Sequence, residues 1–385
     1  MSGNLDGASD GVSDVRKTPI DGEKLENVVG FCMSGGGYRA MLFHAGAVFR
    51  LNELGLLPKL NRISSVSGGS MTAAALALAY PKLGFDATGF AANLTQEFLK
   101  PILKQAEDSI DIASGFAGLN PFSSASNQAA KSYQRNLTGN ARLASLPLTP
   151  TFVFNATNLM TGNTMRFRPD YVADYAIGQF DNVDVPLSLV VAASASFPPF
   201  LSPTTIDLKS GTLRVEARGV LARPPFTETA VLTDGGVYDN LGTETVWKRC
   251  RTVLLSNAGR PFDSQPDPKE NWLQQSLRVV DISMDQSEDL RERIMVHAYQ
   301  VGARNGAMWG LTTGLLKEED RPALLTQSEA EEASRVSTRL WKLPKKTQAL
   351  LLKAGYAHAA SRIRAYYGTE KGGPADIPDG QWPTP

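Results

Sequence analysis

Two glycine-rich turns, some thirty residues apart, constrain the fold of this chain more than any other feature. The first turn, Ser-Gly-Gly-Gly-Tyr-Arg-Ala, spans residues 34–40, and the second, Ser-Val-Ser-Gly-Gly-Ser, spans residues 65–70. Each follows a short apolar run and precedes a stretch with helical spacing, which predicts strands at 28–33 and 62–66 and helices at 38–54 and 71–80. Such a unit implies a parallel strand pair joined by a right-handed crossover, and therefore an α/β fold.

The rest of the chain predicts a catalytic domain over residues 25–367, between a flexible N-terminal segment at 1–24 and an extended tail at 368–385. Residues 84–147 mix spaced aromatic and aliphatic residues with many Ser, Asn and Gly, so we expect a helical cap or lid inserted into the sheet domain. Further strands are expected at 151–155, 165–168, 231–233, 251–255 and 277–283, and further helices at 185–196, 286–309 and 345–367.

Composition excludes several classes of function. Lys plus Arg equals Asp plus Glu at 39 each, so no overall field favours nucleic acid. Two cysteines and three histidines are too few and too scattered for a disulfide framework or an expected metal site, and we predict no cofactor. We find neither a signal-peptide pattern nor an apolar run of about 18 residues, which predicts a cytoplasmic protein without a transmembrane helix.

The first turn is suited to an anion. Consecutive glycines between a strand and a helix leave backbone N–H groups where the helix dipole favours negative charge. The pattern from Gly35 to Ala40 also fits a dinucleotide fingerprint, but the next strand ends without the acidic residue that would hold a ribose. A Walker loop would need Lys-Ser/Thr after the last glycine. An oxyanion hole and a simple tight turn remain, and the candidate donors are Gly35, Gly36 and Gly37.

The second turn resembles a nucleophile elbow, G-x-S-x-G, in which small residues let a strand and a helix pass close to a strained serine. Ser67 takes the place of the nucleophile and Gly69 that of the second glycine. Ser65 replaces the first glycine, so the match is imperfect. Its position directly after the predicted strand–helix–strand unit favours a catalytic serine.

A serine nucleophile needs a base, and the three histidines fall in predicted helical stretches. Asp234 ends an apolar strand and precedes two glycines, which places it at the carboxyl edge where open α/β sheets hold their active sites. A desolvated carboxylate there would be a stronger base than a free Asp. A plain Asp-Gly turn is the alternative reading.

At this point the chain resembles the patatin-like phospholipases, including the cytosolic phospholipase A2 group. The resemblance rests on the first turn, the Ser67 turn, the Ala-Ser-Ala-Ser-Phe-Pro-Pro-Phe block at 193–200 and the Asp-Gly-Gly at Asp234, in the family's order. Residues 155–158 and 353–356 also match, so the similarity is spread over roughly 28–365.

The resemblance implies a three-layer α/β/α fold with a mainly parallel sheet and a helical cap insertion. Ser67 would attack an ester carbonyl, Asp234 would act as the base, and glycine-loop amides would hold the oxyanion. Arg39 falls on the position that contacts the substrate phosphate in the cytosolic group. The implied protein is a lipid acyl hydrolase of phospholipase A type, with phospholipid or other acyl-ester substrates and peripheral membrane contact. A partner-gated or nucleotide-gated effector and a general carboxylesterase are the rival hypotheses, and the sequence leaves an activator and the oligomeric state open.

Overall fold

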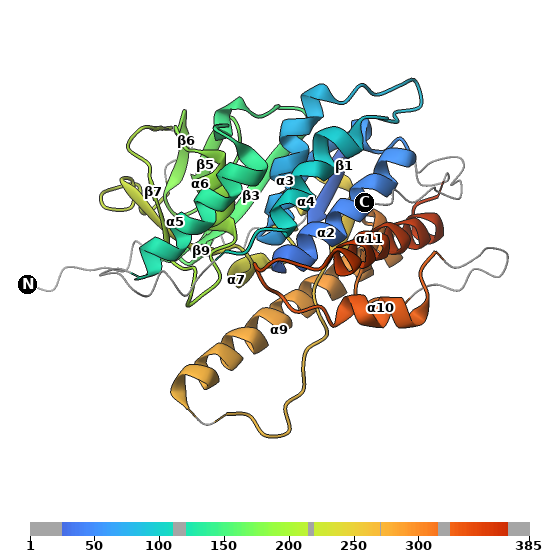
Figure 1. Cartoon of the computed structure of the whole chain (residues 1–385). Helices are drawn as coiled ribbons and strands as arrows, with labels where there is room; N and C mark the ends of the chain where they lie inside the picture. The colour runs from blue at the N-terminus through green and yellow to red at the C-terminus, as the bar shows by residue number, and fades with distance from the viewer. Residues whose placement is uncertain (1–24, 111–120, 215–218, 270, 315–323, 369–385) are drawn as a thin grey trace, which may run out of the picture.

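The computed structural model describes residues 25–110, 121–214, 219–269, 271–314 and 324–368 (Figure 1). The predicted N-terminal segment and almost all of the predicted tail lie outside these residues. The described chain forms one mixed sheet of eleven strands in the order β11-β10-β1-β2-β3-β4-β5-β6-β8, with β9 paired to β3 and β7 to β9. The strands are β1 (Glu26–Met33), β2 (Leu60–Val66), β3 (Thr151–Asn158), β4 (Asn163–Phe167), β5 (Tyr171–Asp174), β6 (Gly178–Asp181), β7 (Thr204–Asp207), β8 (Thr212–Leu213), β9 (Thr229–Asp234), β10 (Cys250–Asn257) and β11 (Asn305–Gly310).

The predicted parallel core is confirmed. β11, β10, β1, β2 and β3 run parallel, whereas the strands from β3 through β4, β5 and β6 to β8 pair antiparallel. The larger helices are α2 (Gly37–Glu53), α3 (Gly68–Ala79), α4 (Lys100–Ala106), α5 (Pro121–Tyr133), α6 (Leu187–Ser194), α9 (Trp272–Gln300), α10 (Gln327–Ser334) and α11 (Lys345–Tyr366), with the short α7 (Gly236–Asp239) and α8 (Glu244–Trp247).

Side-chain alternation along β1 divides the core into two layers. Phe31 and Met33 belong to a large apolar cluster that also holds α2, α3, α6 and α11. Cys32, which points to the opposite face, packs in a smaller cluster with Val246 of α8 and Met295 of α9. Helices therefore cover both faces of the sheet, which confirms the three-layer α/β/α architecture.

The segment predicted as a cap or lid is helical where it is described. It contains α4, α5 and π-helical turns at Thr95–Leu99 and Gln134–Thr138. Phe98, Ile102 and Tyr133 from this segment are fully buried in the large cluster. Its described helices are thus part of the packed core, and movement as a lid stays a prediction.

Two sequence predictions were wrong in the same region. Residues 277–283 form no strand but lie within α9. This helix begins after Asn271, and the Asn271 side chain caps it by accepting a hydrogen bond from the Gln274 amide at 2.9 Å. The predicted helix at 286–309 ends at Gln300, and β11 follows as an edge strand parallel to β10. A β-branched run misled the first prediction, and a non-local strand pairing decided the second. Among the described helices, none has the length and apolarity to cross a bilayer.

Candidate active site

Strand β3 brings the two predicted catalytic residues together. β2 runs parallel to β3 and its last pair is Val66 with Asn155, whereas β9 runs antiparallel and ends with Asp234 opposite Ala156. Both strands lie along the same edge of β3, because β4 occupies the other edge. Their carboxyl ends therefore meet head to head, which explains how residues far apart in sequence share one site.

Ser67 stands in the turn between β2 and α3 with φ 51°, a left-handed conformation that non-glycine residues rarely adopt. Such strain costs on the order of 1–3 kcal/mol and clusters at functional sites. Gly69 permits the sharp turn, since a Cβ there would lie 2.5 Å from the Met33 carbonyl oxygen. A Cβ on Gly68 would lie 2.1 Å from the carbonyl oxygen of Gly37. The serine turn is thus packed directly on the glycine loop.

A buried chain of serine hydroxyls supports this turn. The Ser67 amide donates to Ser194 Oγ at 3.0 Å, and Ser194 Oγ donates its one proton to the Asn155 carbonyl at 2.7 Å. Ser70 Oγ, 2.8 Å from Ser194 Oγ, must therefore be the donor in that pair. Ser65 Oγ lies 3.0 Å from Ser70 Oγ, so the hydroxyl that replaces the first elbow glycine is a member of the chain. Only the resemblance of the 193–200 block pointed to Ser194.

Asp234 is buried beside Ser67. Its carboxylate accepts a hydrogen bond from the Gly236 amide at 2.8 Å, and it lines the same pocket as the Ser67 side chain. Burial raises the pKa of Asp234 to about 6, and the Gly236 amide and the Ser67 side chain oppose the rise. The Asp234 amide donates to the Ser196 carbonyl at 2.9 Å and the Gly235 amide to the Ser194 carbonyl at 3.1 Å. Residues 194–196 therefore bind both turns, because Ser194 also accepts the hydrogen bond from the Ser67 amide.

The histidines are used elsewhere. The His44 ring lies 2.8 Å from Ser256 Oγ and 2.9 Å from the Ser34 carbonyl oxygen, and burial lowers its pKa to about 3. His358 is buried near the Phe43 ring, with ring centroids 6.1 Å apart, and burial lowers its pKa to about 4. Both imidazoles are therefore kept neutral and engaged in packing, and the base nearest to Ser67 is a carboxylate.

Of the three glycine-loop amides that the sequence suggested as oxyanion donors, two have no acceptor among the described residues. The Gly35 amide donates to the Asn240 carbonyl at 3.0 Å, so Gly35 is not a free oxyanion donor, which corrects that expectation. Gly36 and Gly37 adopt φ 133° and 58°, and their amides donate to no acceptor among the described residues. Both line the pocket that contains Ser67 and Asp234. They are the remaining candidates for an oxyanion hole.

Arg39 lies in the wall of the same pocket and is almost completely buried. Its Nε donates to the Ala258 carbonyl at 3.0 Å and its Nη1 to the Val336 carbonyl at 2.9 Å. Burial and then the nearby Arg260 lower the pKa of Arg39 to about 10, a value at which it stays charged at neutral pH. The guanidinium is rigidly held, and its contact with a substrate phosphate stays a prediction.

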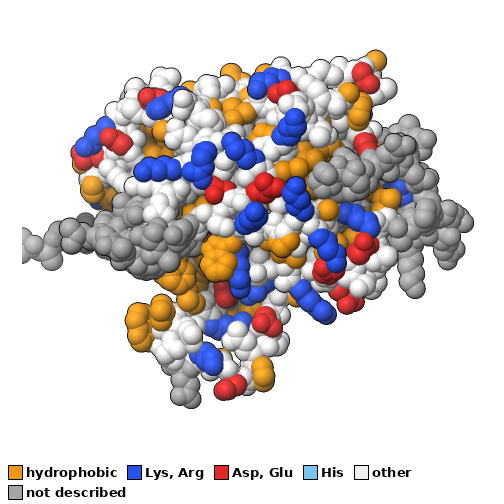
Figure 2. Space-filling view, in the orientation of Figure 1, with side chains coloured by type: hydrophobic (Ala, Val, Ile, Leu, Met, Phe, Trp, Pro, Cys, Tyr) orange, Lys and Arg blue, Asp and Glu red, His pale blue; other side chains and the backbone are white. Residues whose placement is uncertain are grey.

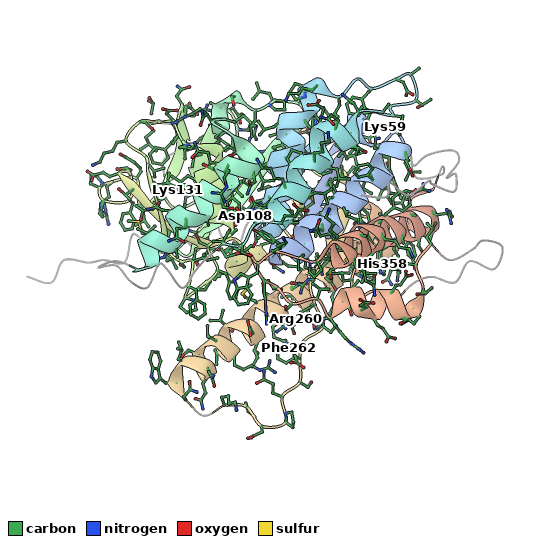
Figure 3. The ribbon with its side chains drawn as sticks, in the orientation of Figure 1. Lys59, Asp108, Lys131, Arg260, Phe262 and His358 are labelled. Carbon is green, nitrogen blue, oxygen red and sulfur yellow. The ribbon has the colours of Figure 1, made fainter. Side chains whose placement is uncertain are left out.

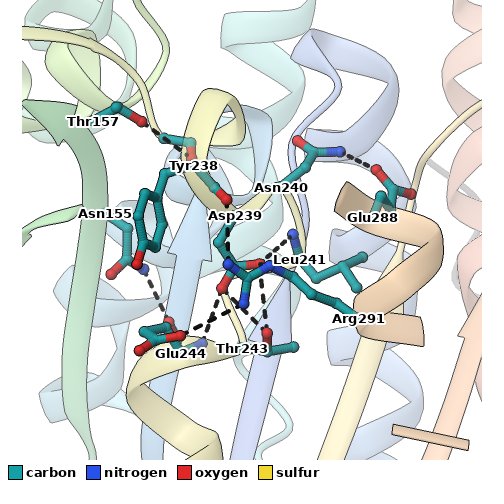
Figure 4. Close-up of polar contacts among 12 residues, drawn as sticks. Asn155, Thr157, Tyr238, Asp239, Asn240, Leu241, Thr243, Glu244, Glu288 and Arg291 are labelled. Carbon is teal, nitrogen blue, oxygen red and sulfur yellow. Dashed lines mark hydrogen bonds and ion pairs between the residues drawn. The ribbon is translucent and has the colours of Figure 1, made fainter. Parts of the chain in front are cut away.

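Asn240 is a site residue that the sequence analysis missed. Its Nδ2 donates to Glu288 Oε2 at 2.7 Å (Figure 4). Glu288 Oε1 accepts from Asn257 Nδ2, also at 2.7 Å. Burial raises the pKa of Glu288. Asn240 also holds the Gly35 amide, so it connects the glycine loop to α9. No sequence motif signalled this link, because it joins segments that meet only in the folded chain.

The pocket around Ser67 has a volume of about 620 Å³. Arg260 and Phe262 line it beside α9 (Figure 3), and other charged side chains line it among apolar ones. Its apolar lining residues are Ala195, Phe197, Phe200, Leu201, Pro261, Phe262, Met284, Leu340 and Trp341. No described residue of the 84–147 segment lines it. The walls suit a flexible hydrocarbon chain next to a charged group.

This chain is similar to a known protein family and, at low identity, to several solved structures. The human GIVD cytosolic phospholipase A2 structure is 13% identical, with a TM-score of 0.46, and the match covers 88% of this chain and 61% of that chain. The VipD structure from Legionella pneumophila is 13% identical, with a TM-score of 0.36, covering 89% of this chain and 68% of that one. A search of curated proteins finds no match. The model of the family described as patatin-like phospholipase matches residues 31–247, more than half of the chain. The chain therefore belongs to the patatin-like phospholipase family.

Proposed function

We propose that this protein is a lipid acyl hydrolase of phospholipase A type that works through Ser67 and Asp234. The observation that carries the proposal is the placement of a strained serine beside a buried carboxylate in one pocket, with a carboxylate pKa that burial raises to about 6. A base is most effective when its pKa lies close to the working pH. Membership of the family supports lipid acyl esters as the substrate class.

In the first half of the proposed reaction, Ser67 Oγ attacks the ester carbonyl carbon while its proton passes to Asp234. The carbonyl oxygen becomes an oxyanion, which the amides of Gly36 and Gly37 stabilise. Preorganised donors of this kind contribute about 3–4 kcal/mol each to acyl transfer. The C–O bond of the alcohol then breaks, Asp234 returns the proton to the leaving oxygen, and the acyl group remains on Ser67.

In the second half, a water molecule gives its proton to Asp234 and attacks the acyl-enzyme. The tetrahedral intermediate collapses, the bond between the acyl carbon and Ser67 Oγ breaks, and the proton returns to Ser67. A fatty acid leaves and both residues regain their starting states. One carboxylate thus acts as base and acid in turn, without a histidine.

Aromatic side chains at the pocket mouth support contact with a lipid surface. Phe200, Phe262 and Trp341 line the pocket and are 43%, 41% and 52% exposed. Trp272 begins α9 and is also largely exposed. Hydrophobic side chains gather at the lower left of Figure 2, over the N-terminal half of α9. Aromatic residues favour the membrane interface, so this rim would let an acyl chain enter directly from a bilayer.

A lipid-release profile tests the proposal. Wild type, Ser67→Ala and Asp234→Asn are incubated with a mixed membrane extract, and released fatty acids are quantified by mass spectrometry. Ser145→Ala is the matched control, because Ser145 is exposed and does not line the pocket. We expect release by wild type and Ser145→Ala, and almost none by the two site variants. Undiminished release by Ser67→Ala would refute the mechanism.

A further inference from the structure

A second, smaller pocket lies near the start of β2, away from the catalytic turn. Its charged lining residues are Arg62, Arg166, Arg168, Lys248 and Arg249, with Glu244 as the one acidic group. The uncharged lining residues are Val153, Tyr171, Tyr175 and Thr245. Arg62 and Ser67 are five residues apart on one extended strand, or about 17 Å at 3.3 Å per residue. No residue is shared between this pocket and the catalytic one.

Arg62 is the unusual member of this cluster. Its side chain is only 8% exposed, yet it makes no hydrogen bond and no ion pair with any described residue, and its Nε is buried without a partner. Burial, together with Arg168 and Arg249, lowers its pKa. An unpaired buried charge is costly, and proteins normally pair such groups. A missing anionic partner would explain its position.

The surrounding cations strengthen this conclusion. Lys248 is paired with Glu244 at 2.7 Å and Arg168 with Asp170 at 2.8 Å. Within the described part of the chain, Arg166 and Arg249 have no carboxylate partner, as is true of Arg62. Arg166 is instead held over the Tyr175 ring, 4.4 Å from its centroid. Three guanidinium groups therefore line one pocket without a negative charge to balance them.

We propose that this pocket binds a phosphate group. Guanidinium is planar and presents paired N–H donors that match phosphate oxygens, and such charge-assisted hydrogen bonds are strong. The inner volume of about 30 Å³ suits one small group. Tyr175 and Arg249 are exposed at the pocket, so the remainder of a phosphomonoester would stay outside. The phosphate belongs either to a soluble molecule or to a lipid headgroup.

Binding is tested on the full-length protein in two arms at constant ionic strength. In the soluble arm, calorimetry and thermal unfolding are followed with inorganic phosphate and with glycerol 3-phosphate, against chloride. In the vesicle arm, co-sedimentation compares phosphatidylcholine alone with phosphatidylcholine containing phosphatidic acid. The variants are Arg62→Met and Arg249→Gln, and the control is Arg293→Gln, an exposed arginine of α9. Neither arm depends on ester hydrolysis, so the result is independent of the proposed reaction.

We expect wild type and Arg293→Gln to bind in at least one arm, and Arg249→Gln to bind at least tenfold more weakly. Arg62→Met should lose binding, and its Tm without phosphate should rise, because the variant removes an uncompensated buried charge. Binding in the soluble arm would assign the site to a soluble phosphomonoester, and binding only to phosphatidic acid vesicles would assign it to a lipid headgroup. No binding in either arm, or equal binding by wild type and Arg62→Met, would overturn the proposal.

Discussion

Ser194→Ala tests whether the serine chain positions the nucleophile. The change removes the acceptor of the Ser67 amide and the donor to the Asn155 carbonyl, at 3.0 and 2.7 Å. A buried donor left without a partner costs about 1–3 kcal/mol. If the Ser67 turn relaxes so that its amide finds another partner, Ser67 Oγ moves out of its reactive position, and the transition state loses a similar amount of stabilisation. Since about 1.4 kcal/mol is a factor of ten, kcat should fall by about 10- to 100-fold, whereas KM should change little.

Ser196→Ala is the matched control, because it removes a hydroxyl from the same segment without touching Ser67. Ser196 Oγ donates to the Ala192 carbonyl at 2.8 Å and contacts Thr204 Oγ1. Its backbone carbonyl, which accepts from the Asp234 amide, is unaffected. Initial rates on a soluble chromogenic ester and Tm values are measured for both variants. We expect both to lose stability and only Ser194→Ala to lose kcat. An equal loss of kcat, or an unchanged kcat in Ser194→Ala, would refute the positioning role.

Four further predictions concern the pH dependence of activity, the pH dependence of stability, the head group and the elbow. Because Asp234 acts as a base only when ionised and burial raises its pKa to about 6, kcat/KM should fall below that pH and level off above it. Because the pKa of Asp234 is raised in the folded state, protonation of this carboxyl stabilises the fold at low pH, and this stabilisation is lost as the pH rises through 6. The Tm of Asp234→Asn should therefore depend on pH less than the Tm of wild type. Arg39→Ala should reduce hydrolysis of phospholipids more than that of neutral esters, and equal losses in paired assays would remove the phosphate role. Gly69→Ala should destabilise the fold by several kcal/mol in denaturant unfolding, because its Cβ would meet the Met33 and Ser34 carbonyl oxygens at 2.5 and 2.7 Å.

The sequence predicted the parts of the fold that depend on local signals. The glycine turns mark where β1 and β2 end and where α2 and α3 begin, and apolar spacing identified the elements between them. Asp234 was found because a strand end followed by two glycines has a local signature. The same reasoning wrongly placed Gly35 in the oxyanion hole. The Gly35 amide donates to the Asn240 carbonyl, and sequence spacing does not reveal this contact.

What the sequence did not predict depends on contacts between distant segments. β11 is a strand because it pairs with β10, and its own residues resemble a continuation of α9. Asn240 reaches Glu288 only after α9 has packed on the sheet. The unpaired charge of Arg62 becomes visible only when its burial and the surrounding arginines are known together.

The most direct test of the central claim is covalent labelling by a fluorophosphonate, which traps an activated serine. Intact-protein and peptide mass spectrometry would locate the adduct in wild type, Ser67→Ala and Asp234→Asn. The proposed dyad predicts a single phosphonyl group on Ser67 in wild type, none in Ser67→Ala, and labelling at least a hundredfold slower in Asp234→Asn. An adduct on another residue, or labelling of Ser67 at an unchanged rate without the Asp234 carboxylate, would contradict the dyad.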